Sequence, residues 1–437
     1  MTASRRLVTS LALFGIGSLL LAPAAAWAGE GGPAAGNIAW MLTATALVLA
    51  MTLPGLSLFY SGLVRAKNAL SLMAQCFAIA AIVTVLWVAC GYSLAFTTGG
   101  TASALIGDFS RAFLLGLDGR AMSGGIPEAL FMTFQLTFAI ITPALAIGSV
   151  AERMRFSALL WFTALWLLAV YVPIAHWVWG GGWLGSLGAL DFAGGTVVHI
   201  NAGVAGLVAA WRLGPRRGWP VTAMPPHSLM LTMAGAGLLW VGWFGFNAGS
   251  ALAADANAAM ALGVTQVASA AGALAWMVLE WQWHRRPSAL GLASGAVAGL
   301  VAITPAAGFV GFAGALVIGA LAGIAGVLAV NLLKPRLKID DSLDAFFIHG
   351  IAGIVGALLT GVFAAGSLGG TGLPMGRGIL DQLGIQALAV AATLVYDGIV
   401  TAVIVILLDR LIGLRVSREE EIEGLDLAIH GERAYDL

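Results

Sequence analysis

Eleven long apolar stretches run through the sequence, and they constrain its fold more than any other feature. Most are long enough to cross roughly 30 Å of hydrocarbon as a helix, although the eighth is shorter and rich in glycine. A transmembrane barrel would instead show shorter segments of alternating polarity. We therefore predict an all-α polytopic membrane protein with eleven transmembrane helices, near residues 37–62, 69–97, 127–150, 156–176, 193–213, 226–249, 257–283, 289–305, 309–334, 343–366 and 383–413.

The charge content fits a chain that is largely surrounded by lipid. Charged residues make up 10% of the chain and hydrophobic residues 60%, whereas a soluble domain has about 25% charged residues. The 21 basic and 21 acidic residues cancel, which gives no sign of a nucleic-acid partner. Cys76 and Cys90 fall in one predicted helix, roughly 21 Å apart along its axis, so they cannot form a disulfide with each other.

The first residues have the form of a secretory signal peptide. Arg5 and Arg6 precede a short apolar core, and residues 26–28 (Ala-Trp-Ala) have the small-x-small pattern of a cleavage site. We predict that residues 1–28 are cleaved; an uncleaved first helix is the alternative. With the N-terminus in the periplasm, most Lys and Arg residues between the predicted helices fall in cytoplasmic loops, as the positive-inside rule requires. This predicts a multi-pass protein of the cell inner (plasma) membrane with a cytoplasmic C-terminus.

Two matching stretches lie at the starts of the fifth and tenth predicted helices. Asp191 precedes His199 by eight residues, and Asp341 precedes His349 by eight. Both histidines are followed by Ala at +3 and by Gly at +4 and +7. A repeat of five helices must be inverted, because an odd number of spans reverses the direction of the chain. Inverted repeats place a site near the midplane between the halves, and ionisable groups at that depth are costly unless they face a cavity or a partner. We predict that both histidines line a pore.

Several further motifs agree with a single family. They are PGLSLFYSGLVR at 54–65, FQLTFAIITP at 134–143, AERMRFSA at 151–158, IAHWVWGGG at 174–182, DFAGGTVVHINA at 191–202, GWFGFNAGS at 242–250 and HGIAG at 349–353. Together they resemble the ammonium transporters of the bacterial Amt class, within the ammonium transporter/methylammonium permease/Rhesus superfamily. The resemblance runs from about residue 38 to the C-terminus. It implies a homotrimer with one pore per subunit, in which two inverted five-helix halves are followed by an eleventh helix.

The resemblance also implies roles for individual residues. It implies an outer recruitment site for ammonium formed by Phe138, Trp179 and Ser250. Asp191 would support that site from behind, although it could simply cap the fifth helix. Phe138 and Phe246 would stack as a gate below the site; on pattern alone, both read as core residues. His199 and His349 would pair in the pore.

The chemistry of ammonium suits such a site. Aromatic faces attract a desolvated cation by about 2 kcal/mol or more, and a serine hydroxyl can accept one of its protons. Complete desolvation of the ion costs far more than these contacts return. A pore that removes a proton at its mouth and passes neutral ammonia avoids that cost, and it rejects sodium and potassium. Neutral imidazoles each carry one donor and one acceptor, so a histidine pair can bind ammonia or relay a proton.

We predict transmembrane uptake of ammonium or ammonia that is electrogenic. An electroneutral gas channel for ammonia and an ammonium sensor with the same fold are the alternatives. A membrane enzyme has little support, because no metal cluster, nucleophile motif or phosphate loop stands out. No cofactor and no metal site are predicted.

The polar residues 414–437 follow the predicted membrane domain 29–413. They read either as a solvated end or, by the resemblance, as a cytoplasmic regulatory tail; P-II signalling proteins would then plug the pores from the cytoplasm. Asp397 falls near the middle of the eleventh helix, and we predict that it is protonated or hydrogen-bonded at the subunit interface.

The remaining polar residues have simpler interpretations. Glu152 with Arg153 and Arg155 reads as a cytoplasmic structural cluster, and Asp341 and Asp344 read as caps of the tenth helix. No chemistry is assigned to the four histidines near segment ends or in the tail, which are His176, His227, His284 and His430.

Overall fold

The computed structural model describes residues 35–435 and is built almost entirely of helices. Ten of them are long and apolar enough to cross a membrane, and the shorter apolar helix Ala289–Ile303 makes eleven among the described residues. The prediction of an all-α polytopic membrane protein is therefore confirmed. The predicted signal peptide, residues 1–28, lies outside the described residues.

The elements of the first half follow one another through five spans, in which η denotes a 3₁₀ or π-helical turn. They are α2 (Ala35–Ala50), η1 (Met51–Leu56), α3 (Ser57–Leu63), η2 (Ala66–Asn68), α4 (Ala69–Leu86), η3 (Trp87–Gly91), α5 (Tyr92–Phe96), η4 (Gly100–Ala102), η5 (Ala112–Leu114), the paired strands β1 (Met122–Ser123) and β2 (Ile126–Pro127), α6 (Glu128–Ala146), η6 (Ile147–Val150), α7 (Phe156–Trp166), η7 (Leu167–Tyr171), α8 (Val172–Val178), α9 (Trp183–Leu187), η8 (Gly195–Ile200) and α10 (Asn201–Leu213).

The second half adds six spans and the C-terminal segment. Its elements are α11 (Leu229–Gly249), α12 (Ala256–His284), α13 (Ala289–Ile303), α14 (Phe312–Leu328), η9 (Ala329–Leu333), α15 (Lys334–Leu337), η10 (Phe346–Gly350), α16 (Ile351–Phe363), η11 (Gly366–Leu368), α17 (Ile379–Leu411), α18 (Arg418–Glu423) and α19 (Leu425–His430).

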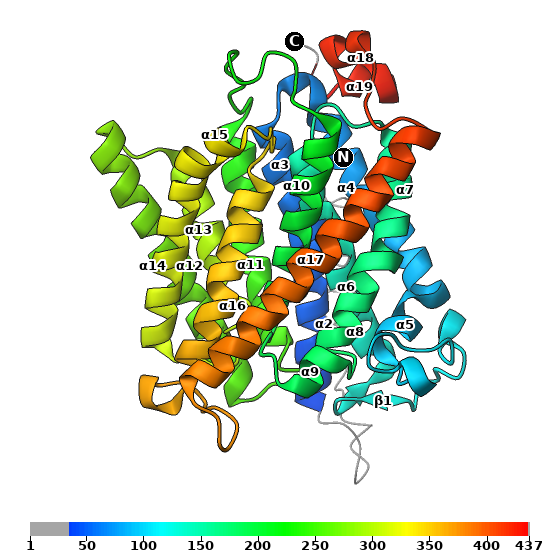
Figure 1. Ribbon diagram of the computed structural model, residues 1–437, viewed down its shortest axis with the longest axis vertical. Coiled ribbons are helices and arrows are strands. Elements are labelled where there is room, and N and C mark those ends of the chain that lie inside the picture. The colour runs from blue at the N-terminus through cyan, green and yellow to red at the C-terminus, as the bar shows by residue number, and fades with distance from the viewer. Residues whose placement is uncertain (1–34, 436–437) are drawn as a thin grey trace, which may run out of the picture.

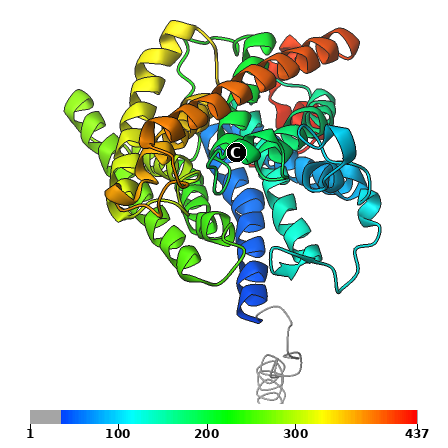
Figure 2. The ribbon, with the colours of Figure 1, turned by 60° about the horizontal axis from the view of Figure 1, so that its bottom comes forward.

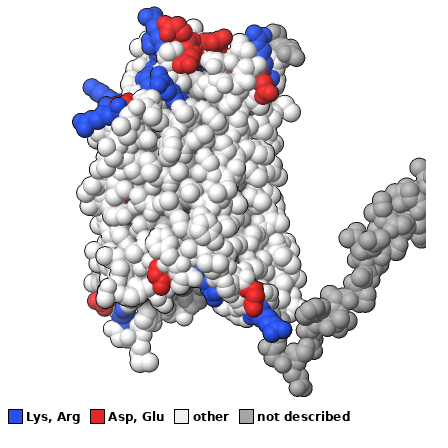
Figure 3. Space-filling model, turned by 90° about the vertical axis from the view of Figure 1, so that its right-hand side faces the viewer, with Lys and Arg blue, Asp and Glu red and all other residues white. Residues whose placement is uncertain are grey.

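The spans stand side by side, and the two ends of the bundle are distinct (Figure 1). One end carries α9 and β1, and we call it the outer end; the opposite end carries α15, α18 and α19, and we call it the inner end. Figure 3 shows Lys, Arg, Asp and Glu gathered at these two ends, with an uncharged band between them on that face. Charges are excluded from the band because burying them in hydrocarbon is costly.

The two histidine-bearing helices run in opposite directions and cross near the centre of the bundle. Their close approach depends on glycine: a Cβ on Gly203 would lie 2.6 Å from the backbone nitrogen of Gly350. The corresponding residue of the second half is Gly353, where a Cβ would lie 3.0 Å from the Ile200 side chain. These are the two glycines four residues after each histidine, so the repeated sequence pattern has a direct structural cause.

Helix α17 runs diagonally along the outside of the bundle (Figures 1 and 2). One face of it is exposed and apolar, whereas the opposite face buries a row of polar side chains, Gln382, Gln386, Thr393, Asp397 and Thr401. This row lies at helical spacing, so it forms a single stripe directed into the protein.

The buried Asp397 belongs to this stripe. Its Oδ1 accepts hydrogen bonds from Trp166 Nε1 at 3.2 Å and from the Thr401 hydroxyl at 2.5 Å. The predicted hydrogen bonding at a subunit interface is therefore wrong, because the side chain is fully buried and its partners are in the same subunit. The other alternative, a protonated carboxyl, stays a prediction. The sequence could not indicate Trp166, which lies 231 residues away.

A buried ionic cluster joins the loops at the inner end. Arg216 pairs with Asp340 at 2.8 Å and with Glu152 at 3.3 Å, and Glu152 also pairs with Arg65 at 2.9 Å. The predicted structural cluster at this position is present, with Glu152 and Arg153 in it, but neither Arg153 nor Arg155 pairs with a carboxylate among the described residues. The buried Arg153 donates instead to carbonyl groups and to Ser342, and Arg155 donates to the carbonyl of Ile412.

The C-terminal segment folds back onto the inner end rather than extending into solvent. Leu414 accepts a hydrogen bond from Arg155 N at 2.8 Å, and Val416 N donates to Arg153 O at 3.1 Å. Further along, the Asp426 carboxylate accepts from the backbone nitrogens of Leu70 and Ser71 at 3.1 and 2.7 Å. Asp426 thus caps the start of α4, where the N–H groups of a helix lack internal partners.

Candidate functional site

The candidate site begins with a cavity of about 310 Å³ near the outer end. Its walls contain three of the predicted recruitment residues, Phe138, Trp179 and Ser250. Ser250 follows the last residue of α11, and its hydroxyl donates to Phe246 O at 2.9 Å. The oxygen lone pairs of Ser250 are thereby left for a donor inside the cavity. The other lining residues are Phe96, Phe131, Gln135, Val178, Phe192 and Leu252.

Trp179 is held in place by the residue that was predicted to support the site. Its Nε1 donates to the backbone oxygen of Asp191 at 2.8 Å. Asp191 itself is buried and does not line the cavity. The indole therefore presents its ring to the cavity while its single polar atom is bonded behind it.

The Asp191 carboxylate caps the start of η8. Oδ1 accepts from the backbone nitrogens of Gly194 and Gly195 at 2.9 and 2.7 Å, and Oδ2 accepts from those of Thr196 and Val197 at 2.9 and 3.0 Å. Burial raises the pKa of the Asp191 carboxyl, and these four N–H donors oppose that shift. The capping interpretation is thus confirmed.

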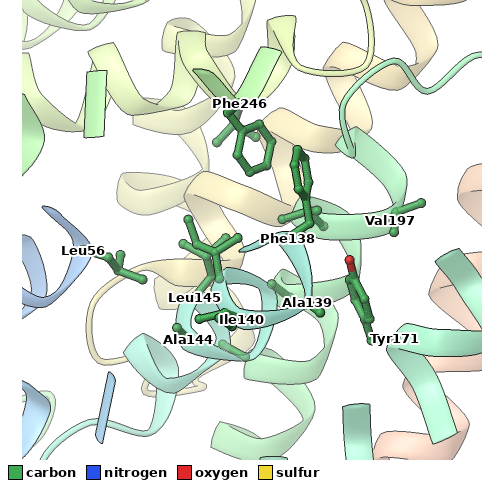
Figure 4. Close-up of a cluster of buried hydrophobic side chains, with 14 of the residues drawn as sticks. Leu56, Phe138, Ala139, Ile140, Ala144, Leu145, Tyr171, Val197 and Phe246 are labelled. Carbon is green, nitrogen blue, oxygen red and sulfur yellow. The ribbon is translucent and has the colours of Figure 1, made fainter. Parts of the chain in front are cut away.

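A pair of phenylalanine rings closes the floor of the cavity. The rings of Phe138 and Phe246 lie 4.3 Å apart between centroids and are inclined by 32° (Figure 4). Phe138 also meets the indole of Trp179 edge-on, at 5.8 Å and 88°. Both phenylalanines are buried, so the pair separates the cavity from what lies below.

The two histidines lie directly below this ring pair. The rings of His199 and Phe246 are 5.9 Å apart between centroids, and those of His199 and His349 are 5.4 Å apart and nearly parallel, at 17°. The two buried imidazoles are therefore brought together, although their positions in sequence are 150 residues apart. Both nitrogens of His199 and the Nδ1 of His349 have no hydrogen-bond partner among the residues from 35 to 435.

Each histidine occupies a π-helical turn, His199 in η8 and His349 in η10. Such turns are rare in proteins and occur often at functional sites. The Asp341 carboxylate caps the second turn by accepting from the backbone nitrogens of Ala345 and Phe346 at 3.0 and 2.8 Å. The prediction for Asp344 was wrong: it pairs with Lys334 and caps nothing with its side chain among the described residues.

A second cavity of about 250 Å³ lies at the inner end, beyond the histidines. Its walls combine apolar residues such as Phe59, Leu63 and Ile348 with Arg216 and Lys334. Ile348, the residue before His349, lines this cavity, whereas neither histidine does. The order from outer to inner end is therefore cavity, ring pair, histidine pair and cavity.

Two residues of the site were not predicted from the sequence. The indole of Trp243 lies parallel to the ring of His199, at 5.2 Å and 21°, and its Nε1 donates to Thr304 at 2.8 Å. Gln135 lines the outer cavity. Trp243 could have been found, because it lies three residues before Phe246 and thus on the same face of α11. Gln135 could have been found in the same way, because it lies three residues before Phe138 and thus on the same face of α6.

The chain is similar to known proteins over most of its length. A model of the Ammonium Transporter Family matches residues 39–435. An ammonium transporter of Aquifex aeolicus is 52% identical over 414 residues, which cover 94% of this chain and 96% of that protein. An ammonium transporter of Bacillus subtilis is 49% identical over 403 residues, which cover 92% and 98%.

Two solved structures have the same fold. A sensor Amt protein superimposes with a TM-score of 0.84 at 30% identity, covering 90% of this chain and 98% of its own. Mep2 of Saccharomyces cerevisiae superimposes with a TM-score of 0.80 at 38% identity, covering 89% and 91%. The family match, the identities and the shared helical bundle lead to one conclusion: the chain belongs to the ammonium transporter family.

Proposed function

We propose that the protein takes up ammonium through the line of residues described above and that the uptake carries net charge. Ammonium is recruited in the outer cavity against Trp179, Phe138 and Ser250. It gives up a proton there, and ammonia passes the Phe138–Phe246 gate to the histidine pair. Ammonia leaves through the inner cavity, and the proton crosses separately.

The observation that carries this proposal is the unbroken series of ring contacts. Trp179, Phe138, Phe246, His199 and His349 follow one another with centroid separations of 5.8, 4.3, 5.9 and 5.4 Å. The first members offer aromatic faces, which suit a cation. The last two offer ring nitrogens in an otherwise apolar interior, which suit a neutral hydrogen-bonding molecule. The change in wall chemistry along the line matches a change of the substrate from ammonium to ammonia.

Two alternatives use the same fold. An electroneutral gas channel would pass ammonia without charge, and a sensor would bind ammonium without sustained flux. The sensor alternative has a known example of this fold, because one of the similar solved structures is a sensor Amt protein. We favour uptake because the relatives with the highest identities quoted above are named ammonium transporters.

The assembly and its regulation belong to the same proposal. We propose a homotrimer in the inner membrane with the N-terminus in the periplasm and the C-terminus in the cytoplasm. A trimeric P-II signalling protein binds the cytoplasmic face. The docked C-terminal segment supports this, because it lies at the inner end among the loops that surround the exit.

Competition for uptake tests the proposed recruitment site. Purified protein in liposomes is expected to take up labelled methylammonium, and ammonium should compete with it while potassium should not. Trp179→Leu should raise the concentration of ammonium needed for half-inhibition by roughly thirtyfold, since a desolvated cation–π contact of about 2 kcal/mol is lost. The exposed Trp281→Leu serves as a control and should leave uptake unchanged. Binding of ammonium without any uptake would instead support a sensor.

A further inference from the structure

The side-chain amide of Gln386 makes the most extensive set of contacts in the polar stripe of α17. The side chain is buried, and its Oε1 accepts a hydrogen bond from the backbone nitrogen of Leu190 at 2.7 Å. Its Nε2 donates to the backbone oxygens of Leu190 at 2.8 Å and of Ala357 at 2.9 Å. The oxygen and the nitrogen of the amide are therefore bonded to backbone groups of the loop before η8 and of α16, and the oxygen also accepts from the neighbouring Gln382.

Gln386 joins the loop that leads into η8, the turn of His199, to α16, the helix that follows the turn of His349. Leu190 directly precedes Asp191, which caps η8 and accepts the hydrogen bond from the Trp179 indole. Ala357 lies on α16, eight residues beyond His349. One side chain thus fixes the approach to η8 against α16.

A second glutamine strengthens this connection. Gln382 Nε2 donates to Gly188 O at 2.9 Å and to Gln386 Oε1 at 3.3 Å. Nearby, Arg377 donates to Leu187 O at 3.0 Å. The outer end of α17 and the loop just before it therefore hold residues 187, 188 and 190, and Gln386 contacts the one next to Asp191.

We propose that Gln386 is a positioning residue that sets the geometry of the outer recruitment site through Leu190 and Asp191. It touches neither the outer cavity nor the histidines, and it acts by fixing the backbone that holds Trp179. An amide is required because the position needs an acceptor and two donors at once. This inference rests on the proposed recruitment of ammonium at Trp179.

The test uses Gln386→Met, which keeps the length of the side chain and removes its hydrogen bonds. Ammonium-dependent uptake is measured with purified protein in liposomes over a range of ammonium concentrations. The half-saturating concentration is expected to rise roughly five- to tenfold, with the maximal rate within about twofold of the wild type. The matched control is Thr393→Val, on the same buried face of α17, whose hydroxyl has no hydrogen-bond partner between residues 35 and 435. Its half-saturating concentration should equal that of the wild type.

Several results would overturn the proposal. One is an unchanged half-saturating concentration in folded Gln386→Met; another is a lower maximal rate with unchanged half-saturation, which a merely structural role would produce. If Gln386→Met does not fold, Gln386→Glu decides, because it keeps an acceptor for Leu190 N and loses both donors, and it should show the same rise. Failure of both variants to fold would also overturn the proposal. Absence of uptake by the wild type would refute the proposed function instead, so the two failures are distinguishable.

Discussion

At the scale of single residues, two aspartates perform equivalent work in the two halves. Asp191 and Asp341 each accept hydrogen bonds from the first free N–H groups of the turn that carries a histidine. A carboxylate is favourable there because it satisfies groups that the helix leaves unpaired and because it complements the helix dipole. The cap fixes where the π-helical turn starts, and the fixed offset of eight residues then fixes where each imidazole lies.

The buried Asp397 is expected to stabilise the fold through the hydrogen bonds that it accepts. Oδ1 accepts from Trp166 and Thr401, whereas Oδ2 has no partner among the described residues. Asp397→Asn keeps an oxygen that can accept both hydrogen bonds. The free energy of unfolding, measured by thermal denaturation, should therefore change by less than about 1 kcal/mol. Asp397→Leu leaves the indole N–H and the hydroxyl unpaired and should cost roughly 1–3 kcal/mol. Equal destabilisation by the two variants would mean that the charge itself is needed.

The sequence predicted the identity of the site residues better than their partners. The two histidines and their aspartates could be found because a local spacing is repeated in the chain. Trp166 beside Asp397 and Leu190 beside Gln386 could not be found, since those contacts depend on how distant helices pack. A buried amide that bonds to backbone groups leaves no signature in the sequence, because the backbone is the same at every position.

At the scale of elements, the fold depends on how closely the two histidine-bearing helices cross. Length and hydropathy predicted the spans well, because both are local properties that the thickness of a bilayer imposes. The π-helical turns of η8 and η10 and the docking of α18 and α19 were not predicted, because tertiary contacts decide them.

The crossing yields a prediction with an internal control. In Gly203→Ala, the added Cβ would lie 2.6 Å from the backbone nitrogen of Gly350, so α10 and η10 must separate. We expect uptake to fall at least tenfold, because the imidazoles move apart. Gly237→Ala on α11 adds a Cβ with nothing within 4 Å, and it should transport like the wild type. Normal uptake by Gly203→Ala would show that the spacing of the histidines tolerates change.

The C-terminal segment yields a second prediction at this scale. Deletion of residues 414–437 removes the contacts of the segment with Arg153, Arg155 and the start of α4. We expect impaired uptake or loss of its inhibition by a P-II protein, measured in liposomes with and without that protein. Asp426→Asn, which weakens only the cap of α4, should give a smaller effect in the same direction. A truncated protein with unchanged uptake and unchanged P-II binding would contradict a regulatory role.

At the scale of the whole molecule, the charged side chains on the face shown in Figure 3 gather at the two ends, and the inner end is held together by ion pairs. Arg216 lies at their centre, with hydrogen bonds of 2.9 and 2.8 Å from its guanidinium to Asp340. Burial alone would raise the pKa of Asp340, but the hydrogen bonds and charge of Arg216 outweigh burial and lower the pKa below its usual value.

This shift predicts how the stability of the protein depends on pH. A carboxyl with a lowered pKa in the folded state adds stability above its unfolded pKa of about 4, and that stability is lost as pH falls through the folded value. At pH 7, Asp340→Asn should lower the free energy of unfolding by about 3 kcal/mol, because Arg216 loses a buried partner. The difference between variant and wild type should shrink below about pH 4. If the difference in free energy of unfolding stayed constant down to pH 3, the ionised Asp340 would not be the source of the stability.

We propose that ammonium enters at the outer site and that charge crosses the membrane with it. The most direct measurement is an ammonium jump on a solid-supported membrane that carries the protein in liposomes, with internal pH recorded in parallel. We expect a transient current for the wild type that is lost in Asp191→Ala and in the double variant His199→Ala/His349→Ala. Alkalinisation inside the vesicles without any current would contradict charge-coupled uptake and support a gas channel, and the absence of both signals would contradict transport itself.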